Sequence, residues 1–472
     1  MSIAQTVYDR LPARSRSVAA SARGFYLNWW RYGRESERLV EKALERDSWT
    51  SDQWADWQSE RLQLVLQRAL RSVPYYKAIG ATLPWPHKDE TAPSLDAWPI
   101  LEKRQLREMS RAFISDDCRT SKMFREHTSG TTGTSLDIWL TKETVRSWYA
   151  LFEARCRRWY GVSRHDRWAI VGGQLVVPVQ QKRPPFWVWN AGMNQLYLSS
   201  YHLSPDMIDG YLDALVRYRV SYILGYPSAM YRLALRALRS KRKDIRLKVA
   251  ITNAEPVYNY QRDAITAAFT CPVRETYGMA EIVAAASECA EGSLHQWPEV
   301  GIIEVAGSSP AGEFICTGLL NKDMPLIRYR VGDRGTLSDR KCACGKGLPV
   351  VEKIEGRNDD VLFTRDGRAV GRLDPVFKGD LGIEEAQIIQ HSLAEVHVKY
   401  VRGEEFGPRQ GDDLKARIQE RLGDMHVRLE EVTAIPRTAR GKFKAVVCNL
   451  PAEVRREIEY GPLENLNSTA TK

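Results

Sequence analysis

The sequence predicts an α/β protein with a large N-terminal region and a smaller α/β unit near the C-terminus. Short apolar runs that end in glycine, asparagine or proline alternate with amphipathic stretches from about residue 125 to 335. Such runs lie at 167–173, 221–227, 247–256 and 312–320. Runs of strand length between helical patterns are typical of layered α/β folds. Residues 360–450 show the same alternation on a smaller scale and end in the strand-like KAVVCNL.

The composition is that of an ordinary globular protein. The chain has 472 residues, 43% of them hydrophobic and 27% charged, which excludes a disordered chain, a collagen-like fibre and a coiled-coil rod. The sequence contains no stretch of about 18 uncharged apolar residues, so it predicts no membrane-spanning helix. The first residues have no secretory apolar region, so we expect a cytoplasmic protein with reduced thiols.

The net charge of +10 is open to several interpretations. Nucleic acid, an anionic membrane and a small polyanionic substrate each attract a basic protein, and the excess also needs no partner at all. The basic run at 239–243 has no interleaved aromatic residues and ends an amphipathic stretch. Cations suit the C-terminus of a helix, so we expect a solvated helix end there and no nucleic-acid partner.

Residues 1–75 predict a helical segment rich in arginine and tryptophan. At 24–34 the aromatic residues Tyr26, Trp29, Trp30 and Tyr32 are interleaved with arginines. One interpretation is a peripheral contact with an anionic membrane, which would make the protein membrane-associated. The favoured alternative is a helical cap whose aromatic residues pack on the main domain. The next helix, near 48–70, has Ser51 or Asp52 as its candidate N-cap.

The strongest local motif is HTSGTTGTS at 127–135. Glycines permit close backbone approach, and hydroxyl and backbone N–H groups donate hydrogen bonds to phosphoryl oxygens, so the motif suits a phosphate-binding loop. It lacks the Gly-Lys-Ser/Thr ending of the P-loop motif. The alternative is a surface linker.

Four further motifs are weak when taken singly. In YGMAE at 277–281 the tyrosine suits stacking on a purine and the glutamate suits Mg²⁺. A carboxylate ends IRYRVGD at 327–333, where it suits two ribose hydroxyls. EGRNDD at 355–360 is typical of a turn. PRTARGKF at 436–443 presents one lysine beside glycine, and such a lysine could stabilise a negative charge that develops during a reaction.

In this order the five motifs resemble the adenylate-forming superfamily, and within it the branch of phenylacetate–CoA ligase and its capsule-biosynthesis relatives. The resemblance covers roughly residues 60–450. It implies an α/β fold with a large, multi-subdomain N-terminal adenylating domain and a small, mobile α+β C-terminal domain. We therefore expect a cap at 1–75, an AMP-binding domain at 76–358, a C-terminal domain at 359–450 and a tail at 451–472.

The resemblance also implies a role for individual residues. The phosphate loop would be Ser129, Gly130, Thr131, Thr132 and Gly133. Glu255 and Pro256 would border the adenine, on which Tyr277, followed by Gly278, would stack. Asp333, assisted by Arg357, would hold the ribose, and Asp359 would be the domain hinge. The catalytic residues would be Glu281 as the Mg²⁺ ligand, Thr131, and Lys442, which would bridge the substrate carboxylate and the α-phosphate.

Cysteine spacing predicts a structural zinc site. Cys289 and His295 follow the tyrosine motif, and Cys342 and Cys344 precede the Gly-Arg motif. Three thiols and one imidazole are enough for one closed tetrahedral Zn²⁺ site. Because each pair lies beside a nucleotide motif, we expect the two pairs to meet; some members of the family branch carry such a metal clip. The alternative is two unrelated reduced pairs.

The expected function is ATP-dependent activation of a carboxylic acid as an acyl-adenylate, followed by transfer to coenzyme A. An amine acceptor, giving an amide ligase, and a non-catalytic nucleotide-binding relative are the alternatives. By the family layout, the acid would lie between 171–173 and 225–227. Aromatic walls from Trp187, Trp189 and Tyr197 would then fit an aryl or otherwise flat acid, with ordinary core packing as the alternative.

Overall fold

A computed structural model describes most of the chain. The described residues are 8–80, 95–127, 136–178, 180–181, 183–204, 206–307, 310–355, 360–371, 373–377, 381–403, 405–433, 435 and 445–460. Their helices are α2 (Ala13–Arg31), α3 (Ser36–Arg46), α4 (Ser51–Ser72), α5 (Pro74–Gly80), α6 (Lys103–Glu108), α7 (Lys142–Cys156), α8 (Ile208–Arg217), α9 (Pro227–Arg239), α10 (Asn259–Phe269), α11 (Pro408–Leu422) and α12 (Ala452–Tyr460).

The strands form four sheets. They are β1 (Phe124–His127), β2 (Asp137–Leu140), β3 (Trp168–Gly172), β4 (Trp187–Asn190), β5 (Gln195–Ser199), β6 (Tyr222–Gly225), β7 (Val249–Thr252), β8 (Val273–Gly278), β9 (Ala285–Glu288), β10 (Leu294–Gln296), β11 (Gly301–Val305), β12 (Ala311–Gly318), β13 (Tyr329–Ser338), β14 (Val350–Glu355), β15 (Leu362–Phe363), β16 (Ala369–Val370), β17 (Ile383–Gln390), β18 (Glu395–Arg402), β19 (His426–Glu431) and β20 (Val446–Cys448).

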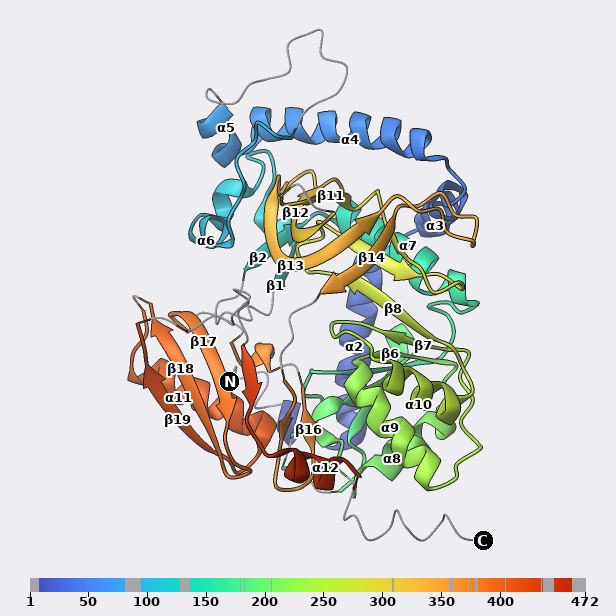
Figure 1. Cartoon of the computed structure of the whole chain (residues 1–472), viewed down its shortest axis with the longest axis vertical. Coiled ribbons are helices and arrows are strands. Elements are labelled where there is room, and N and C mark those ends of the chain that lie inside the picture. The colour runs from blue at the N-terminus through green and yellow to red at the C-terminus, as the bar shows by residue number, and fades with distance from the viewer. Residues whose placement is uncertain are drawn as a thin grey trace.

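The large sheet has twelve strands in the order β11-β12-β13-β14-β10-β9-β8-β7-β6-β3-β5-β4. From β8 to β5 the neighbouring strands are parallel, whereas β8 and β9 begin an antiparallel half. Every residue of β6 and β7 is buried, as expected for parallel strands covered on both faces. Helices α8, α9 and α10 lie over the parallel half (Figure 1), and their apolar sides share one core with its strands.

The N-terminal helix α2 packs against edge strand β4 of the large sheet. Gly24 lies against Asn190 and Gly192 so closely that a Cβ would lie 1.8 Å from the Asn190 side chain. Trp30 is buried, whereas Trp29 is 57% exposed. The cap interpretation is therefore correct for the inner face of α2. At the start of α4 the N-cap is Thr50, not Ser51 or Asp52, because Thr50 and Gln53 form a reciprocal capping box.

A buried ion network ties the cap to the main domain. The Arg155 guanidinium of α7 is fully buried and binds Asp47, which follows α3, at 2.9 Å. The same guanidinium binds both carboxylate oxygens of Glu299, at 2.7 and 3.0 Å. A buried arginine is tolerated where carboxylates and hydrogen bonds satisfy it, so this network fixes α3 beside α7 and the antiparallel half of the sheet.

The C-terminal unit is a four-stranded sheet in the order β19-β18-β17-β20, with α11 packed against it (Figure 1). Arg368, between β15 and β16, is buried and donates to the backbone oxygens of Tyr201 and Arg421, both at 2.8 Å. The predicted α/β fold with a large N-terminal and a small C-terminal domain is thus confirmed. Part of the expected tail forms helix α12.

Candidate functional site

Several of the predicted site residues lie outside the described residues. These are Ser129, Gly130, Thr131, Thr132 and Gly133 of the phosphate motif, Arg357, the hinge residue Asp359, and Lys442. The described candidates are Glu255, Pro256, Tyr277, Gly278, Glu281 and Asp333, together with the cysteines and the histidine.

Two strands of the large sheet bring Tyr277 and Asp333 together. Tyr277 lies at the end of β8 and Asp333 within β13, and the tyrosine hydroxyl donates to Oδ2 of Asp333 at 2.9 Å. Glu281 accepts a hydrogen bond at 3.3 Å from the hydroxyl of Tyr329, which is buried at the start of β13. The YGMAE motif at 277–281 and the IRYRVGD motif at 327–333 therefore meet in space, as their predicted roles at one nucleotide require.

The predicted adenine turn follows β7, the strand beside β8. The Asn253 N–H donates to the Gly225 carbonyl at 3.0 Å, and Ala254 has a φ of 65°. A non-glycine residue in the left-handed region is uncommon and marks a constrained turn. Oε2 of Glu255 accepts from the backbone N–H of Ser228 at 3.2 Å. A carboxylate is favoured there because Ser228 lies in the first turn of α9.

A cavity of about 360 Å³ opens beside these residues. The end of strand β8, which carries Tyr277, and the turn that follows it form one wall. The predicted adenine turn contributes Asn253 and Ala254. The other walls are largely aromatic. They comprise Trp30 and Arg31 of α2, Phe124 and Glu126 of β1, Trp148, Tyr149 and Phe152 of α7, and Trp297. A small, mostly apolar cavity with a few polar groups is the usual form of a ligand pocket.

This cavity does not coincide with the acid pocket predicted from the sequence. Neither Trp187 nor Trp189 lines it. Trp189 stacks on Tyr218 at 5.1 Å and Trp187 packs edge-on against Tyr211 at 6.0 Å, so ordinary packing, the stated alternative, explains them. The residues that sequence reasoning missed are the aromatic ones of α7. Their spacing at 148, 149 and 152 on a helix shortly after the phosphate motif was the available signal.

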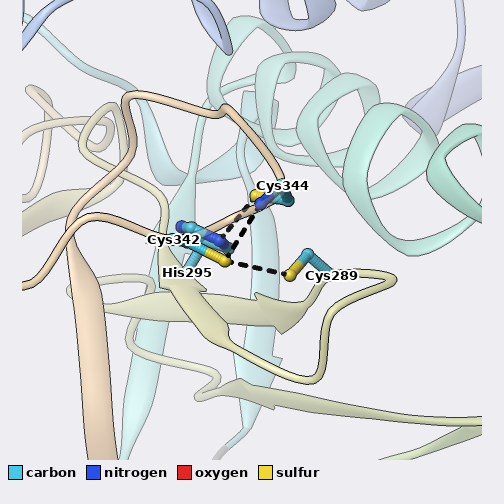
Figure 2. A group of neighbouring side chains, drawn as sticks. All are labelled: Cys289, His295, Cys342 and Cys344. Atoms are coloured by element: carbon cyan, nitrogen blue, oxygen red, sulfur yellow. Dashed lines mark hydrogen bonds between the residues drawn. The ribbon is translucent and has the colours of Figure 1, made fainter.

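The cysteine and histidine pairs meet as predicted. One ligand atom from each of Cys289, His295, Cys342 and Cys344 lies within 4.8 Å of the others. Sγ of Cys289 lies 3.7 Å from Sγ of Cys342, and Nε2 of His295 lies 3.3 Å from Sγ of Cys344. Figure 2 shows the four side chains converging on one point from two segments of the chain. The alternative of two unrelated pairs is excluded.

The surroundings prepare these side chains for a metal ion. Nδ1 of His295 lies 3.0 Å from the Leu348 carbonyl, so an N–H there leaves Nε2 free to act as a ligand. Burial opposes ionisation of Cys342, but hydrogen bonds from Ser293 and the Cys344 backbone outweigh it and lower the pKa of this thiol, whereas burial raises the pKa of the neighbouring Cys344 thiol, so without a metal ion one of the two thiols stays protonated. The loop is held close to the cap, because a Cβ on Gly347 would lie 1.6 Å from the Trp49 carbonyl.

Sequence relatives cover nearly the whole chain. The family described as the CapK C-terminal domain matches residues 362–449. Protein CapK of Staphylococcus aureus is 24% identical over 461 residues, which cover 94% of this chain and 99% of that protein. Phenylacetate–coenzyme A ligase of Aromatoleum evansii is 26% identical over 332 residues, covering 67% of this chain and 73% of the relative.

Solved structures show the same fold. A 2-hydroxyisobutyryl-CoA ligase in complex with its acyl-AMP and CoA in the thioesterification state matches with a TM-score of 0.54. The identity is 19%, over 85% of this chain and 91% of that one. The same ligase in a postadenylation state matches with a TM-score of 0.52. Residues 362–449 thus match the CapK C-terminal domain family, and the chain as a whole is similar in sequence to protein CapK and to phenylacetate–coenzyme A ligases.

Proposed function

We propose that this chain is an ATP-dependent carboxylate ligase that activates an acid as its acyl-adenylate and transfers the acyl group to coenzyme A. The observation that carries the proposal is the hydrogen bond between Asp333 and Tyr277, a tyrosine that lines an aromatic cavity. A purine-stacking ring and a ribose-binding carboxylate are thereby held beside a space that fits an organic acid. The family relation supports the same chemistry.

In the first half-reaction a carboxylate oxygen attacks the α-phosphorus of ATP, and the bond to pyrophosphate breaks. Both reactants are anions, so catalysis depends on neutralising charge and fixing geometry. Lys442 is assigned to the carboxylate and the α-phosphate, and the hydroxyl and N–H groups of residues 129–133, including Thr131, to the other phosphoryl oxygens. Glu281 would hold Mg²⁺, which supplies further positive charge at the phosphates.

Adenosine recognition is assigned to the described residues. Tyr277 offers its ring to the adenine, with Glu255 and Pro256 along the border, while Asp333 and Arg357 take the ribose hydroxyls. The hydroxyl of Tyr277 already binds one oxygen of Asp333. This contact fixes the orientation of the carboxylate.

In the second half-reaction the thiol sulfur of coenzyme A attacks the acyl carbonyl, AMP leaves, and the thiol gives up its proton. A rotation about Asp359 would withdraw Lys442 and admit the thiol. An amine acceptor, which would form an amide, is the second candidate, because the resemblance of the sequence motifs extends to capsule-biosynthesis relatives as well as to CoA ligases. The two candidates share the first half-reaction and differ only in the nucleophile.

A structural zinc ion is assigned to Cys289, His295, Cys342 and Cys344. The donors fit: three sulfurs and one imidazole nitrogen lie within 4.8 Å of one another, and three of the four residues are buried. A four-donor set leaves no open position, so the ion would stabilise the fold and take no part in catalysis.

The outer face of α2, formed by Val18, Phe25, Tyr26 and Trp29, is proposed to touch an anionic membrane surface. These side chains are 70, 61, 52 and 57% exposed. Arg14 and Arg23 are also exposed on this helix. Exposed aromatic residues beside arginines suit an interfacial helix. Within the described residues, no helix is both long and apolar enough to cross a bilayer.

Vesicle sedimentation tests this surface contact. Wild-type protein should pellet with phosphatidylglycerol vesicles and remain free with phosphatidylcholine vesicles. The Trp29→Ser variant should bind the anionic vesicles more weakly, and Tyr260→Ser, which alters an equally exposed aromatic residue of α10, should not. Equal binding of all three proteins contradicts the contact.

Acid-dependent exchange of labelled pyrophosphate into ATP tests the ligase reaction. A panel of aryl, amino and sugar acids should include at least one that supports exchange, and Lys442→Ala should slow this exchange by at least ~10²-fold. Absence of exchange with every acid contradicts the ligase proposal and favours a non-catalytic nucleotide-binding relative. Product analysis with coenzyme A and with amines then distinguishes the two acceptors.

A further inference from the structure

The cavity beside Tyr277 contains one polar corner. Among its described lining residues, Arg31 and Glu126 carry charge, and the remaining walls are mostly aromatic. The Arg31 guanidinium lies 4.3 Å from the centre of the Tyr149 ring. A guanidinium stacked on a ring keeps its N–H donors directed outward in its own plane. It can therefore donate to a ligand without leaving the ring.

Glu126 lies at the same corner. Burial raises the pKa of the Tyr149 hydroxyl, the positive charge of Arg31 lowers it, and the negative charge of Glu126 raises it. A cation and an anion therefore act on one phenol group. Donors and acceptors are both present there, so the corner suits a group that accepts one hydrogen bond and donates another.

The rest of the cavity suits a flat apolar body. Trp30 and Phe124 meet edge to face at 5.6 Å, and Trp148 and Trp297 lie 5.5 Å apart. A cavity of roughly 150 Å³ is enough for benzene, so 360 Å³ holds one ring with substituents and a short acid arm. Gly278 borders this space: a Cβ there would make ordinary contact with Trp148 at 3.5 Å.

From these contacts we propose that the cavity binds a hydroxyl-bearing aryl carboxylic acid, and that Arg31 of the N-terminal helix recognises its hydroxyl group together with Glu126. The inference rests on the ligase function proposed above and supplies its substrate class. The acid group faces the nucleotide side at Tyr277, and the hydroxyl occupies the corner formed by Arg31, Glu126 and Tyr149. Helix α2 thereby becomes part of the specificity pocket.

Two other classes of acid fit less well. An unsubstituted aryl acid offers no hydrogen bond to the Arg31 guanidinium at this corner, and it therefore binds less tightly than an acid that offers one. An acid with a second carboxylate gains Arg31 but is repelled by Glu126. A hydroxyl group can bond to both side chains without adding charge.

Pyrophosphate exchange with three matched acids tests the assignment. One series comprises phenylacetic, 4-hydroxyphenylacetic and 4-carboxyphenylacetic acids, which differ only in the group at ring position 4. The corresponding three benzoic acids form a second series. In each series, kcat/KM should be roughly 10- to 100-fold higher for the hydroxy acid than for the unsubstituted acid. Arg31→Met should remove most of this preference, and Arg31→Lys, which keeps a cationic donor, should recover part of it.

Two further variants complete the design. Arg38→Met changes an exposed arginine of α3 and should leave the acid preference unchanged. Glu126→Gln keeps an acceptor oxygen but removes the negative charge, so it should improve kcat/KM for the acid with two carboxylates. A preference for the unsubstituted acid, or an equal loss for all three acids in Arg31→Met, overturns the assignment while leaving the ligase function intact.

Direct binding separates this inference from the ligase function. Trp30, Trp148 and Trp297 line the cavity, so the hydroxy acid should quench tryptophan fluorescence without ATP. Arg31→Met should weaken this binding roughly 10- to 100-fold. Quenching that depends on Arg31 without any exchange contradicts the ligase function and keeps the pocket. Absence of both quenching and exchange contradicts both proposals.

Discussion

The cysteine–histidine cluster and the Tyr277 site are neighbours that are built differently. Strand β9 pairs with β8, which carries Tyr277, and with β10, which carries His295. The cluster gathers four donors around one point. At the Tyr277 site, by contrast, the hydroxyl of Tyr277 binds Asp333 and that of Tyr329 binds Glu281, beside a cavity that Tyr277 lines. A closed donor cluster suits stability, whereas polar groups beside an open cavity suit exchange of substrates.

The cluster should carry the larger share of stability. Cys289→Ser removes one of the four donors, and we expect loss of bound zinc and a decrease of about 4–5 kcal/mol in the free energy of unfolding. Metal analysis and denaturant unfolding measure both quantities. Cys118→Ser, at a half-buried cysteine outside the cluster, should change neither. A zinc content far below one per chain in the wild type contradicts the assignment.

Lys442 should show the opposite pattern. Lys442→Ala should slow adenylation by at least ~10²-fold, as expected for the loss of one preorganised electrostatic group, and leave zinc content and the free energy of unfolding unchanged. Lys415→Ala alters an exposed lysine of α11 and is the matched control. Exchange at the wild-type rate in Lys442→Ala contradicts the role given to this residue.

Strand β8, which carries Tyr277, should make stability depend on pH. Burial, reinforced by the charge of Glu288, raises the pKa of Glu275 in β8 from 4.5 to about 7. A raised carboxyl pKa favours folding below the unfolded value, and this stability is lost as pH rises from about 4.5 through 7. Glu275→Gln should therefore be more stable than wild type at pH 8, by on the order of 1–3 kcal/mol, and comparable at pH 4.5. If the free energy of unfolding changes with pH in the same way for both proteins, the assignment of this pH dependence to Glu275 is contradicted.

Tyr277→Phe should have the smallest effect. The variant keeps the ring for stacking but removes the hydrogen bond to Asp333. We expect KM for ATP to rise up to about tenfold, with little change in kcat. Steady-state kinetics at saturating acid measure this change, and Tyr260→Phe, at an exposed tyrosine of α10, is the control. A change confined to kcat would argue against ribose positioning.

The sequence predicted the fold and the cysteine–histidine cluster because both depend on patterns within short segments. Alternating apolar runs indicated the α/β layers, and two spaced pairs indicated the cluster. The cavity could not be predicted in this way. Its walls combine Arg31, Tyr149 and Trp297 from separate elements, and only the packing of α2 against α7 and the sheet brings them together. The sequence also could not tell whether Trp187 and Trp189 line a binding pocket or pack in the core, because packing and binding select the same aromatic residue types.

Helix α2 also sets an order of events during synthesis. It is synthesised well before the segment it packs on, because the Asn28 side chain donates to the Gly192 carbonyl, 164 residues later in the chain. At about 5–20 residues per second, roughly 10–30 s separate the two ends of this contact. During that interval the inner face of α2 has not yet met this partner and is available to a chaperone or a membrane. The cavity lined by Trp30 and Arg31 closes only after its other walls have been made.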